Sequence, residues 1–145
     1  MIKIYGSVLS SSGRCIWMAE EIGQEWENVP VDFKNREHKS ASYLKLNPNG
    51  KVPVVVDGEY VIWESVAINT YLAEKYQPAL LGLSLEERGH VHQWNYWAVA
   101  NISLPVEVLT LQKWRGTPDN EETAHARTEL DRFLPILEQA LHEKT

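Results

Sequence analysis

The chain has few of the residues that would tie its fold to an oxidising compartment, a metal or a membrane. It contains one cysteine among 145 residues, which excludes an internal disulfide, and no group of Cys and His has the spacing of a zinc site. No run approaches the roughly 18 apolar residues of a membrane helix. The first residues, MIKIYGS, enter a strand pattern without the apolar core of a secretory signal. We therefore predict a cytosolic protein that holds no metal.

Positive charge is also scarce. Fourteen basic side chains stand against 20 acidic ones, for a formal net charge of -6. Such a chain repels polyanions, so we expect neither nucleic acid nor an anionic membrane as a partner. Hydrophobic residues make up 43% of the sequence, an ordinary share for a globular protein, so a packed core is possible without disulfides.

Strand and helix patterns alternate at the start of the chain. Short β-type runs cover residues 2–5 and 29–33, and the second of these alternates apolar and polar positions. Helical patterns cover residues 14–22 and a short piece around 43–46. The order of these elements is βαβα.

A hairpin and a helix follow. In the run VPVVVDGEYVIW, residues 52–63, two β-branched segments are joined at Asp57 and Gly58, a dipeptide typical of a tight antiparallel turn. From Glu64 to residue 76 apolar positions recur mostly at intervals of three and four, which predicts a helix. This ββα unit completes an α/β half with a mixed sheet.

The rest of the chain is predicted to be helical. Ser84 with Glu87 three positions later fits a capping box, and the helical region that it opens runs to about residue 114 with a kink at Pro105. A last helix covers 121–142, where Pro135 predicts a bend. The predicted domains are therefore 1–76 and 84–145, joined by a linker at 77–83.

The stretch VLSSSGRC, residues 8–15, carries three serines between the first strand and the first helix. From the residues alone, the three hydroxyls either form a polar turn or include one that meets a reactive group. Ser12 is placed as the cap of the following helix. Cys15 lies inside that helix, where a buried structural thiol is expected, and the redox CxxC pattern is absent.

The most specific motif is the block EHKSASYLKLNPNGKVPVVVDGEYVIWESVAI, residues 37–68. With its NPxGKVP and ES elements in order, it resembles the glutathione site of the soluble glutathione S-transferase family, within the serine-type, theta/phi-like branch found in bacteria. The resemblance covers essentially the whole chain. It implies a thioredoxin-like N-terminal domain followed by an all-α domain, which is shortened here because family members continue with further helices.

The resemblance also implies an activity. The family joins the thiol of glutathione to hydrophobic electrophiles, with glutathione as co-substrate and no further cofactor. It places the activating hydroxyl on Ser10, with Ser11 in support. Tyr5 is a second, weaker candidate, because tyrosine-type classes carry a phenol near the first strand. A glutaredoxin-like reductase is a weak alternative, since no cysteine occupies the turn.

Further residues would hold the tripeptide by this resemblance. Pro53 matches the family's cis-proline, which would let the backbone of Val52 pair with the cysteinyl unit of glutathione. Glu64 and Ser65 would receive the γ-glutamyl end, although a plain helix start explains them equally well locally. The glycyl carboxylate would meet three basic side chains, whose alternative is a solvated loop: His38, Lys39 and Lys51.

The second substrate leaves a weaker signal. By analogy with the family, its pocket would be lined by Val8, Leu9, Trp97, Asn101 and Pro105.

A non-catalytic binding or scaffold protein on the same fold is the alternative function, which the shortened helical half favours. We expect a homodimer, or marked exposure of the helical layer, because so few helices cannot bury every apolar face. The residues concerned are Trp94, Trp97, Leu130, Phe133 and Leu137.

Overall fold

The computed structural model describes residues 1–142 and divides the chain into two compact units, Met1–Arg88 and Gly89–Thr145. Within the described residues, no helix has the length and apolar character needed to cross a membrane. The predicted linker, residues 77–83, lies inside the first unit and contains the short 3-10 helix η2 (Pro78–Leu81). The predicted domain limits themselves stay a prediction.

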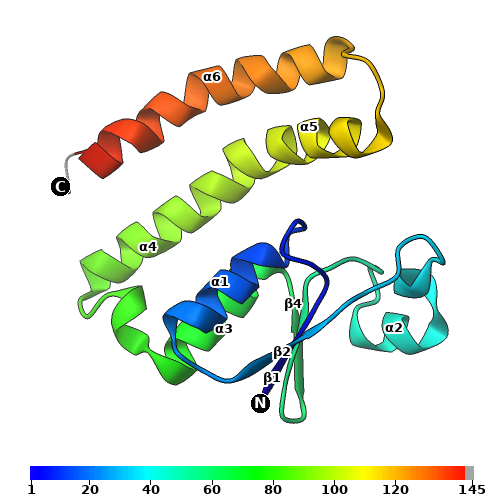
Figure 1. Cartoon of the computed structure of the whole chain (residues 1–145). Helices are drawn as coiled ribbons and strands as arrows, with labels where there is room; N and C mark the ends of the chain where they lie inside the picture. The colour runs from blue at the N-terminus through cyan, green and yellow to red at the C-terminus, as the bar shows by residue number, and fades with distance from the viewer. Residues whose placement is uncertain (143–145) are drawn as a thin grey trace. The chain divides into compact units, whose positions relative to one another are not determined.

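The first unit is a four-stranded mixed sheet with helices on both sides (Figure 1). The strand order is β2-β1-β3-β4, where β2 is parallel to β1 and the other neighbours are antiparallel. Helices α1 and α3 lie together on one side of the sheet, and α2 lies on the other. The strands are β1 (Ile2–Tyr5), β2 (Trp26–Val29), β3 (Val54–Asp57) and β4 (Tyr60–Trp63). The helices are α1 (Gly13–Glu21), η1 (Glu37–Lys39), α2 (Ala41–Leu46) and α3 (Ser65–Tyr76). The predicted thioredoxin-like arrangement is confirmed.

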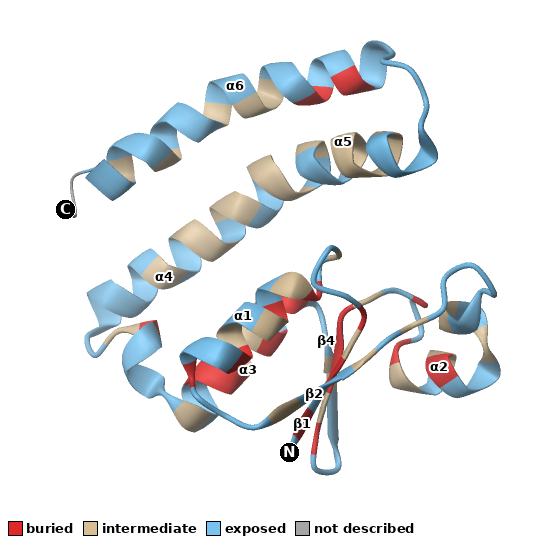
Figure 2. Ribbon diagram, in the orientation of Figure 1, coloured by how far each residue is buried: buried red, intermediate tan, exposed pale blue. Residues whose placement is uncertain are grey.

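The core of this unit lies between the sheet and the pair α1 and α3. Alternate residues of a strand face the same side, so Ile2 and Ile4 of β1 both point to these helices. Figure 2 shows the buried residues concentrated in this unit. The buried cluster consists of Ile2, Ile4, Cys15, Ala19, Ile22, Val55, Ile68 and Leu72.

The second strand lies earlier than predicted. We expected residues 29–33, whereas β2 spans Trp26–Val29 and pairs with β1 from Ile2↔Trp26 to Tyr5↔Val29. Two features decide the register. Pro30 has no N–H to donate to a ladder, and Trp26 packs against the core while its indole Nε1 donates to Glu20 Oε1 at 2.9 Å.

The hairpin forms as predicted, but its turn is one residue later. Asp57 still pairs with Tyr60, so Gly58 and Glu59 are the two loop residues. Gly58 has φ +65°, a conformation that glycine adopts at little cost. Asp57 therefore ends the strand and its side chain is free to serve another purpose.

The second unit is helical. Helix α4 (Leu85–Ala98) enters it, followed by a π-helical turn, η3 (Val99–Ser103), then α5 (Leu104–Arg115) and α6 (Glu121–His142). The capping box predicted at the start of α4 is present: Glu87 N donates to Ser84 Oγ at 3.0 Å, and Ser84 N donates to Glu87 Oε2 at 3.0 Å. The π-helical turn ends two residues before Pro105, which cannot donate to the helical ladder.

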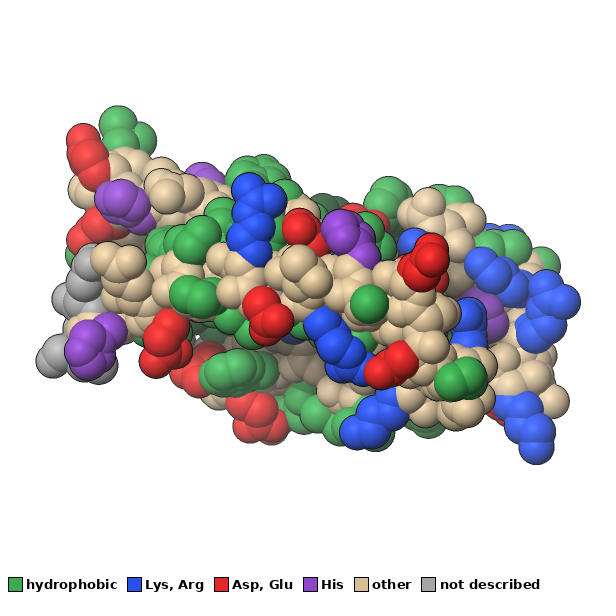
Figure 3. All heavy atoms as spheres, turned by 90° about the horizontal axis from the view of Figure 1, so that it is seen from above, with side chains coloured by type: hydrophobic (Ala, Val, Ile, Leu, Met, Phe, Trp, Pro, Cys, Tyr) green, Lys and Arg blue, Asp and Glu red, His purple; other side chains and the backbone are tan. Residues whose placement is uncertain are grey.

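This unit leaves apolar surface open, but at other residues than the five that we named, which are all half-buried: Trp94, Trp97, Leu130, Phe133 and Leu137. Among its described residues only Thr123 and Ala126 are buried. Figure 3 shows hydrophobic side chains exposed between charged ones on the face seen from above. Exposed examples are Tyr96, Leu104, Trp114, Leu134, Ile136 and Leu141. Whether a second copy covers them is the part of the expectation that stays a prediction.

One polar cluster ties the end of β3 to the end of α3. The carboxylate of Asp57 accepts hydrogen bonds from Tyr71 Oη (2.9 Å), Lys75 Nζ (2.7 Å) and Tyr76 Oη (2.8 Å). Asp57 is only 8% exposed. Burial raises the pKa of Asp57, but the bonds from Lys75, Tyr76 and Tyr71 outweigh burial and hold the pKa below its ordinary value. We call these four residues the Asp57 cluster.

The lowered pKa of Asp57 predicts how stability depends on pH. The pKa is below the value of about 3.9 expected in the unfolded chain, so the contribution of the charged carboxylate is complete above about pH 5 and is lost as the pH falls through the folded pKa. We expect Asp57→Asn to lower the free energy of unfolding by about 1–3 kcal/mol at pH 7, and by less at pH 3, because the loss begins as the pH falls below the unfolded pKa.

Urea unfolding of the wild type and Asp57→Asn at both pH values measures this difference. Asp131→Asn, a change at an exposed carboxylate in α6, is the matched control and should cost little at either pH. A difference between wild type and Asp57→Asn that stays constant from pH 7 to pH 3 would contradict the prediction.

Candidate functional site

The serines lie in a tight turn between β1 and α1, and Ser10 holds this turn together. Ser10 Oγ donates to the carbonyl oxygen of Ser7 at 2.7 Å and accepts from the backbone N–H of Ser12 at 3.2 Å. A serine hydroxyl has one proton. In this arrangement the proton of Ser10 is therefore already used within the turn.

Ser12 is the N-cap residue of α1, as predicted, but its hydroxyl does not cap the helix. Instead its buried Oγ donates to the carbonyl oxygen of Tyr5 at 2.8 Å, which ties the helix start to the end of β1. Gly6 lies beside this contact with φ +120°, and a Cβ there would collide with Ser12 Oγ.

Ser11 differs from its two neighbours. Its side chain is exposed, and within the described part of the chain its hydroxyl has no hydrogen-bond partner. It lies one residue before the N-cap Ser12, close to the first turn of α1, where backbone N–H groups concentrate partial positive charge. Of the three serines, Ser11 has the hydroxyl that is available to an external group.

Cys15 is an unreactive thiol, as expected from its place in α1. It is fully buried, and its Sγ lies 3.9 Å from the carbonyl oxygen of Ser65. Burial raises the pKa of Cys15 to about 12, and the nearby charge of Arg14 offsets this only in part. The thiol stays protonated near neutral pH, so it packs α1 against the start of α3 instead of acting as a nucleophile.

The loop before β3 lies next to the serine turn. The Val52–Pro53 peptide bond is cis, as predicted. Tyr43 Oη and Asn47 Nδ2 donate to the carbonyl oxygen of Lys51 at 3.0 and 2.8 Å, so α2 and the turn after it hold this loop. Val52 also borders Gly6, since a Cβ added at Gly6 would lie 3.2 Å from the Cβ of Val52.

The start of α3 has an uncommon backbone. Glu64 has φ 72° and ψ 113° although it is not glycine, and it is exposed, whereas the following Ser65 is buried. Sparsely populated backbone conformations of this kind concentrate at binding and catalytic sites. The first N–H groups of α3 have no partner within the helix and suit an anion.

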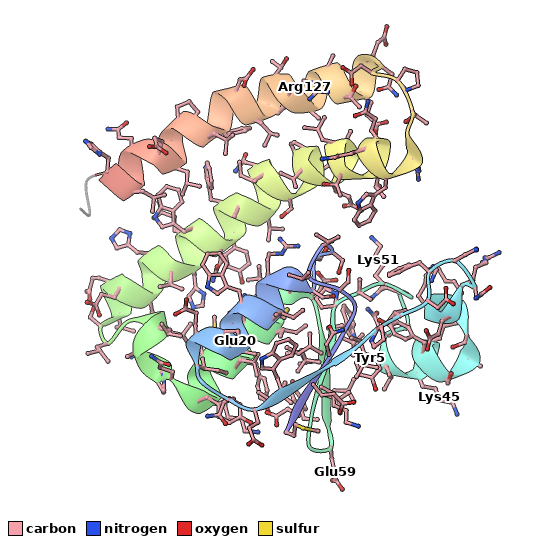
Figure 4. All side chains as sticks on the ribbon, in the orientation of Figure 1. Tyr5, Glu20, Lys45, Lys51, Glu59 and Arg127 are labelled. Carbon is pink, nitrogen blue, oxygen red and sulfur yellow. The ribbon has the colours of Figure 1, made fainter. Side chains whose placement is uncertain are left out.

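The three predicted basic residues are differently placed. Lys39 Nζ donates to the carbonyl oxygens of Asn49 and Gly50, each at 3.1 Å, so Lys39 supports the loop and keeps one further N–H. The ring of His38 lies 4.7 Å from that of Phe33, and its Nδ1 is buried without a hydrogen-bond partner in the described residues. Lys51 is exposed on the loop before β3 (Figure 4).

Direct contacts join three of the predicted segments. The serine turn meets Val52 through Gly6 and Ser12, and α1 meets Ser65 through Cys15. The NPNG motif predicts Asn47 as part of a structural turn, and Asn47 does hold this loop. The sequence reasoning missed two supporting residues, Gly6 and Tyr43, because their roles depend on contacts between distant segments.

The residues proposed for the second substrate do not gather within one unit. Val8 and Leu9 are exposed on the serine turn, at 67% and 75%, whereas Trp97, Asn101 and Pro105 belong to the second unit. The first unit has an open recess of about 540 Å³ along α1, lined by Val8, Ser10, Gly13, Arg14, Ile16, Trp17 and Glu20. Among the described residues no group of His, Cys, Asp and Glu could hold a metal ion.

Residues 2–74 match the family model described as "Glutathione S-transferase, N-terminal domain". Glutathione S-transferase F9 of Arabidopsis thaliana is 46% identical over 114 residues, an alignment that covers 77% of this chain and 53% of that protein. Glutathione S-transferase 1 of Zea mays is 35% identical over 147 residues, which cover 97% of this chain and 69% of that protein. The chain thus spans about half the length of the first relative and about two thirds of the second.

Solved structures agree with these matches. Glutathione transferase F2 of Populus trichocarpa superposes with a TM-score of 0.88 at 29% identity, covering 99% of this chain and 71% of that one. These relatives are plant proteins, so the expected link to a bacterial branch stays a prediction. The match over residues 2–74 and the agreement of fold and sequence together show that the chain belongs to the glutathione S-transferase family.

Proposed function

We propose that this chain binds glutathione and activates its thiol for attack on hydrophobic electrophiles, as part of a cytosolic, homodimeric glutathione transferase. One observation carries the proposal: the serine turn, the cis Val52–Pro53 bond and the strained start of α3 are joined by direct contacts in one unit. A maize glutathione S-transferase I solved in complex with an atrazine glutathione conjugate is 35% identical, which supports this class of reaction.

Each part of the tripeptide has a chemically suitable partner. The backbone of Val52 would pair with the cysteinyl unit in the manner of an added strand. The first N–H groups of α3 and Ser65 would receive the γ-glutamyl carboxylate, and Glu64 would receive its ammonium. His38, Lys39 and Lys51 would surround the glycyl carboxylate, where the unpaired Nδ1 of His38 offers a polar atom with no competing partner in the described residues.

The hydrogen bonds of the turn distinguish Ser10 from Ser11 as the donor to the sulfur of glutathione. Ser10 would have to break its 2.7 Å bond to the Ser7 carbonyl before donating to sulfur. Ser11 has an exposed hydroxyl that donates to no described residue. We therefore assign the sulfur contact to Ser11 and the shape of the turn to Ser10, which exchanges the two roles expected from the sequence.

The energy required is within reach of this site. A cysteine-type thiol has a pKa of about 8.5, and lowering it by two units requires about 2.7 kcal/mol of selective stabilisation of the thiolate. A hydrogen bond to a charged group supplies about 1.5–3 kcal/mol. The positive end of α1 adds about 0.3–1 kcal/mol. The thiolate can then form the new carbon–sulfur bond while the electrophile releases its leaving group or takes up a proton.

A glutathione-binding scaffold without turnover remains the second candidate. The exposed apolar side chains of the second unit favour it, because such surface suits a protein partner. The two candidates share the binding step and differ in the chemistry that follows.

Calorimetric titration with glutathione, followed by a conjugation assay with a chlorodinitroarene, tests the proposal and separates the two candidates. We expect saturable binding and conjugation above the uncatalysed rate. Ser65→Ala should weaken glutathione binding about 3- to 10-fold, because it removes one hydrogen bond to a carboxylate. Binding without conjugation would support the scaffold, and the absence of binding would reject both candidates.

Two serine variants test the assignment within the turn. We expect Ser11→Ala to lower kcat/KM about 10- to 100-fold through loss of thiolate stabilisation, and to raise the pKa of bound glutathione. Ser10→Ala should act on stability more than on that pKa, since its bonds lie inside the turn. Ultraviolet titration of the bound thiolate reads the pKa directly. A raised pKa in Ser10→Ala alone would return the activating role to Ser10.

The state of Cys15 tests the reductase alternative. Its pKa of about 12 and its burial predict that iodoacetamide at pH 8 labels the denatured chain much faster than the folded chain. Cys15→Ala should still catalyse conjugation, because the thiol takes no part in the bond-forming step, although the loss of its contact with the Ser65 carbonyl should weaken glutathione binding somewhat. Fast labelling of the folded protein, measured by intact mass, would contradict the burial of this thiol, and disulfide reduction that disappears in Cys15→Ala would support a reductase.

A further inference from the structure

The Asp57 cluster joins β3 and α3 at the ends that lie away from the candidate glutathione site. β3 follows directly on Val52–Pro53 and ends at Asp57. α3 begins at Ser65 and ends at Tyr76, whose phenol donates to Asp57. Two elements that each carry part of the proposed site are thus tied together at their opposite ends.

The two elements have matching lengths. Val52 and Asp57 are five strand steps apart, which at about 3.4 Å per residue makes about 17 Å. Ser65 and Tyr76 are eleven helix steps apart, which at about 1.5 Å per residue also makes about 17 Å. The residues of the proposed site on β3 and on α3 therefore lie at similar distances from the Asp57 cluster. Because a helix moves as a nearly rigid unit, a shift of α3 along its axis at the cluster would move Ser65 by a similar amount relative to Val52.

The buried carboxylate of Asp57 accepts more hydrogen bonds than the one partner that a buried polar group needs. Three side chains from the last two turns of α3 donate to one carboxylate, and Lys75 Nζ also donates to Tyr71 Oη at 3.1 Å. Apolar residues of similar volume often stabilise such a position as well as an ion pair does. They would not fix the helix along its axis, because apolar contacts have little directionality.

We propose that Asp57 is a positioning residue for glutathione, acting through α3 to keep Glu64 and Ser65 at the correct distance from Val52. This inference rests on the proposed function for its ligand. Cys15 holds the start of α3 sideways against α1 through its contact with the Ser65 carbonyl. Asn69 Nδ2 also donates to the Arg14 carbonyl oxygen at 3.3 Å, on the same side of α3. Asp57 adds three further directional bonds at the other end of the helix, which constrain it along its axis.

The test compares variants of the full chain at a temperature where circular dichroism shows that all are folded. Asp57→Asn keeps the shape but loses the charge, and Tyr76→Phe removes one donor. Ile22→Val, a modest change in the core at the far end of α1, is the control for loss of stability alone. Calorimetry gives the dissociation constant for glutathione, and amide hydrogen exchange reports on residues 68–71, the first hydrogen-bonded amides of α3.

We expect Asp57→Asn to raise the dissociation constant about 3- to 10-fold and Tyr76→Phe about twofold, with faster exchange at residues 68–71. Ile22→Val should leave both unchanged. If Asp57→Asn does not fold, Tyr76→Phe with Tyr71→Phe decides the question. Folded variants that bind glutathione like the wild type would overturn the inference, whatever their stability.

The exchange measurement keeps this inference separate from the proposed function. If the wild-type chain binds no glutathione, the proposed function fails, and the claim that the Asp57 cluster fixes the start of α3 is still decided by exchange. Unchanged exchange at residues 68–71 in Asp57→Asn would then overturn that claim as well. Weakened binding in Ile22→Val equal to that in Asp57→Asn would assign the effect to stability alone.

Discussion

The candidate site depends on the close approach of the serine turn to the loop before β3. At Gly6 the end of β1 passes between the buried hydroxyl of Ser12 and the side chain of Val52. A side chain larger than hydrogen would collide with Ser12 there, and the φ of +120° also favours glycine. Because Gly6 has no side chain, the serine turn and the backbone of Val52 lie close enough together to contact one bound peptide.

The supports around this contact come from separate parts of the chain. Tyr43 and Asn47 hold the Lys51 carbonyl from one side, and Lys39 holds the Asn49 and Gly50 carbonyls from another. Together these bonds satisfy three backbone oxygens in a loop without regular structure. The loop is therefore ordered before any ligand arrives, which reduces the entropy that binding must overcome.

Local patterns predicted most of the fold because its elements follow their own periodicities. The hairpin, the capping box at Ser84 and the last helix were all visible in short stretches. The second strand was misplaced because alternation continues past Val29, whereas Trp26 is fixed by Glu20 and by the core. Periodicity cannot show such a distant contact. Within the site, the same limit explains why the segments could be predicted while the separate roles of Ser10, Ser11 and Ser12 could not.

The division of roles among the serines has a physical reason. A hydroxyl has a single proton, so a serine that closes a turn by donating to a carbonyl cannot also donate to a thiolate. Ser10 and Ser12 both use their protons on carbonyl oxygens, at Ser7 and Tyr5. These bonds fix the backbone on both sides of Ser11 and leave its exposed hydroxyl uncommitted. Three adjacent serines thus give one available donor on a rigid turn, which is the arrangement that stabilising an external anion requires.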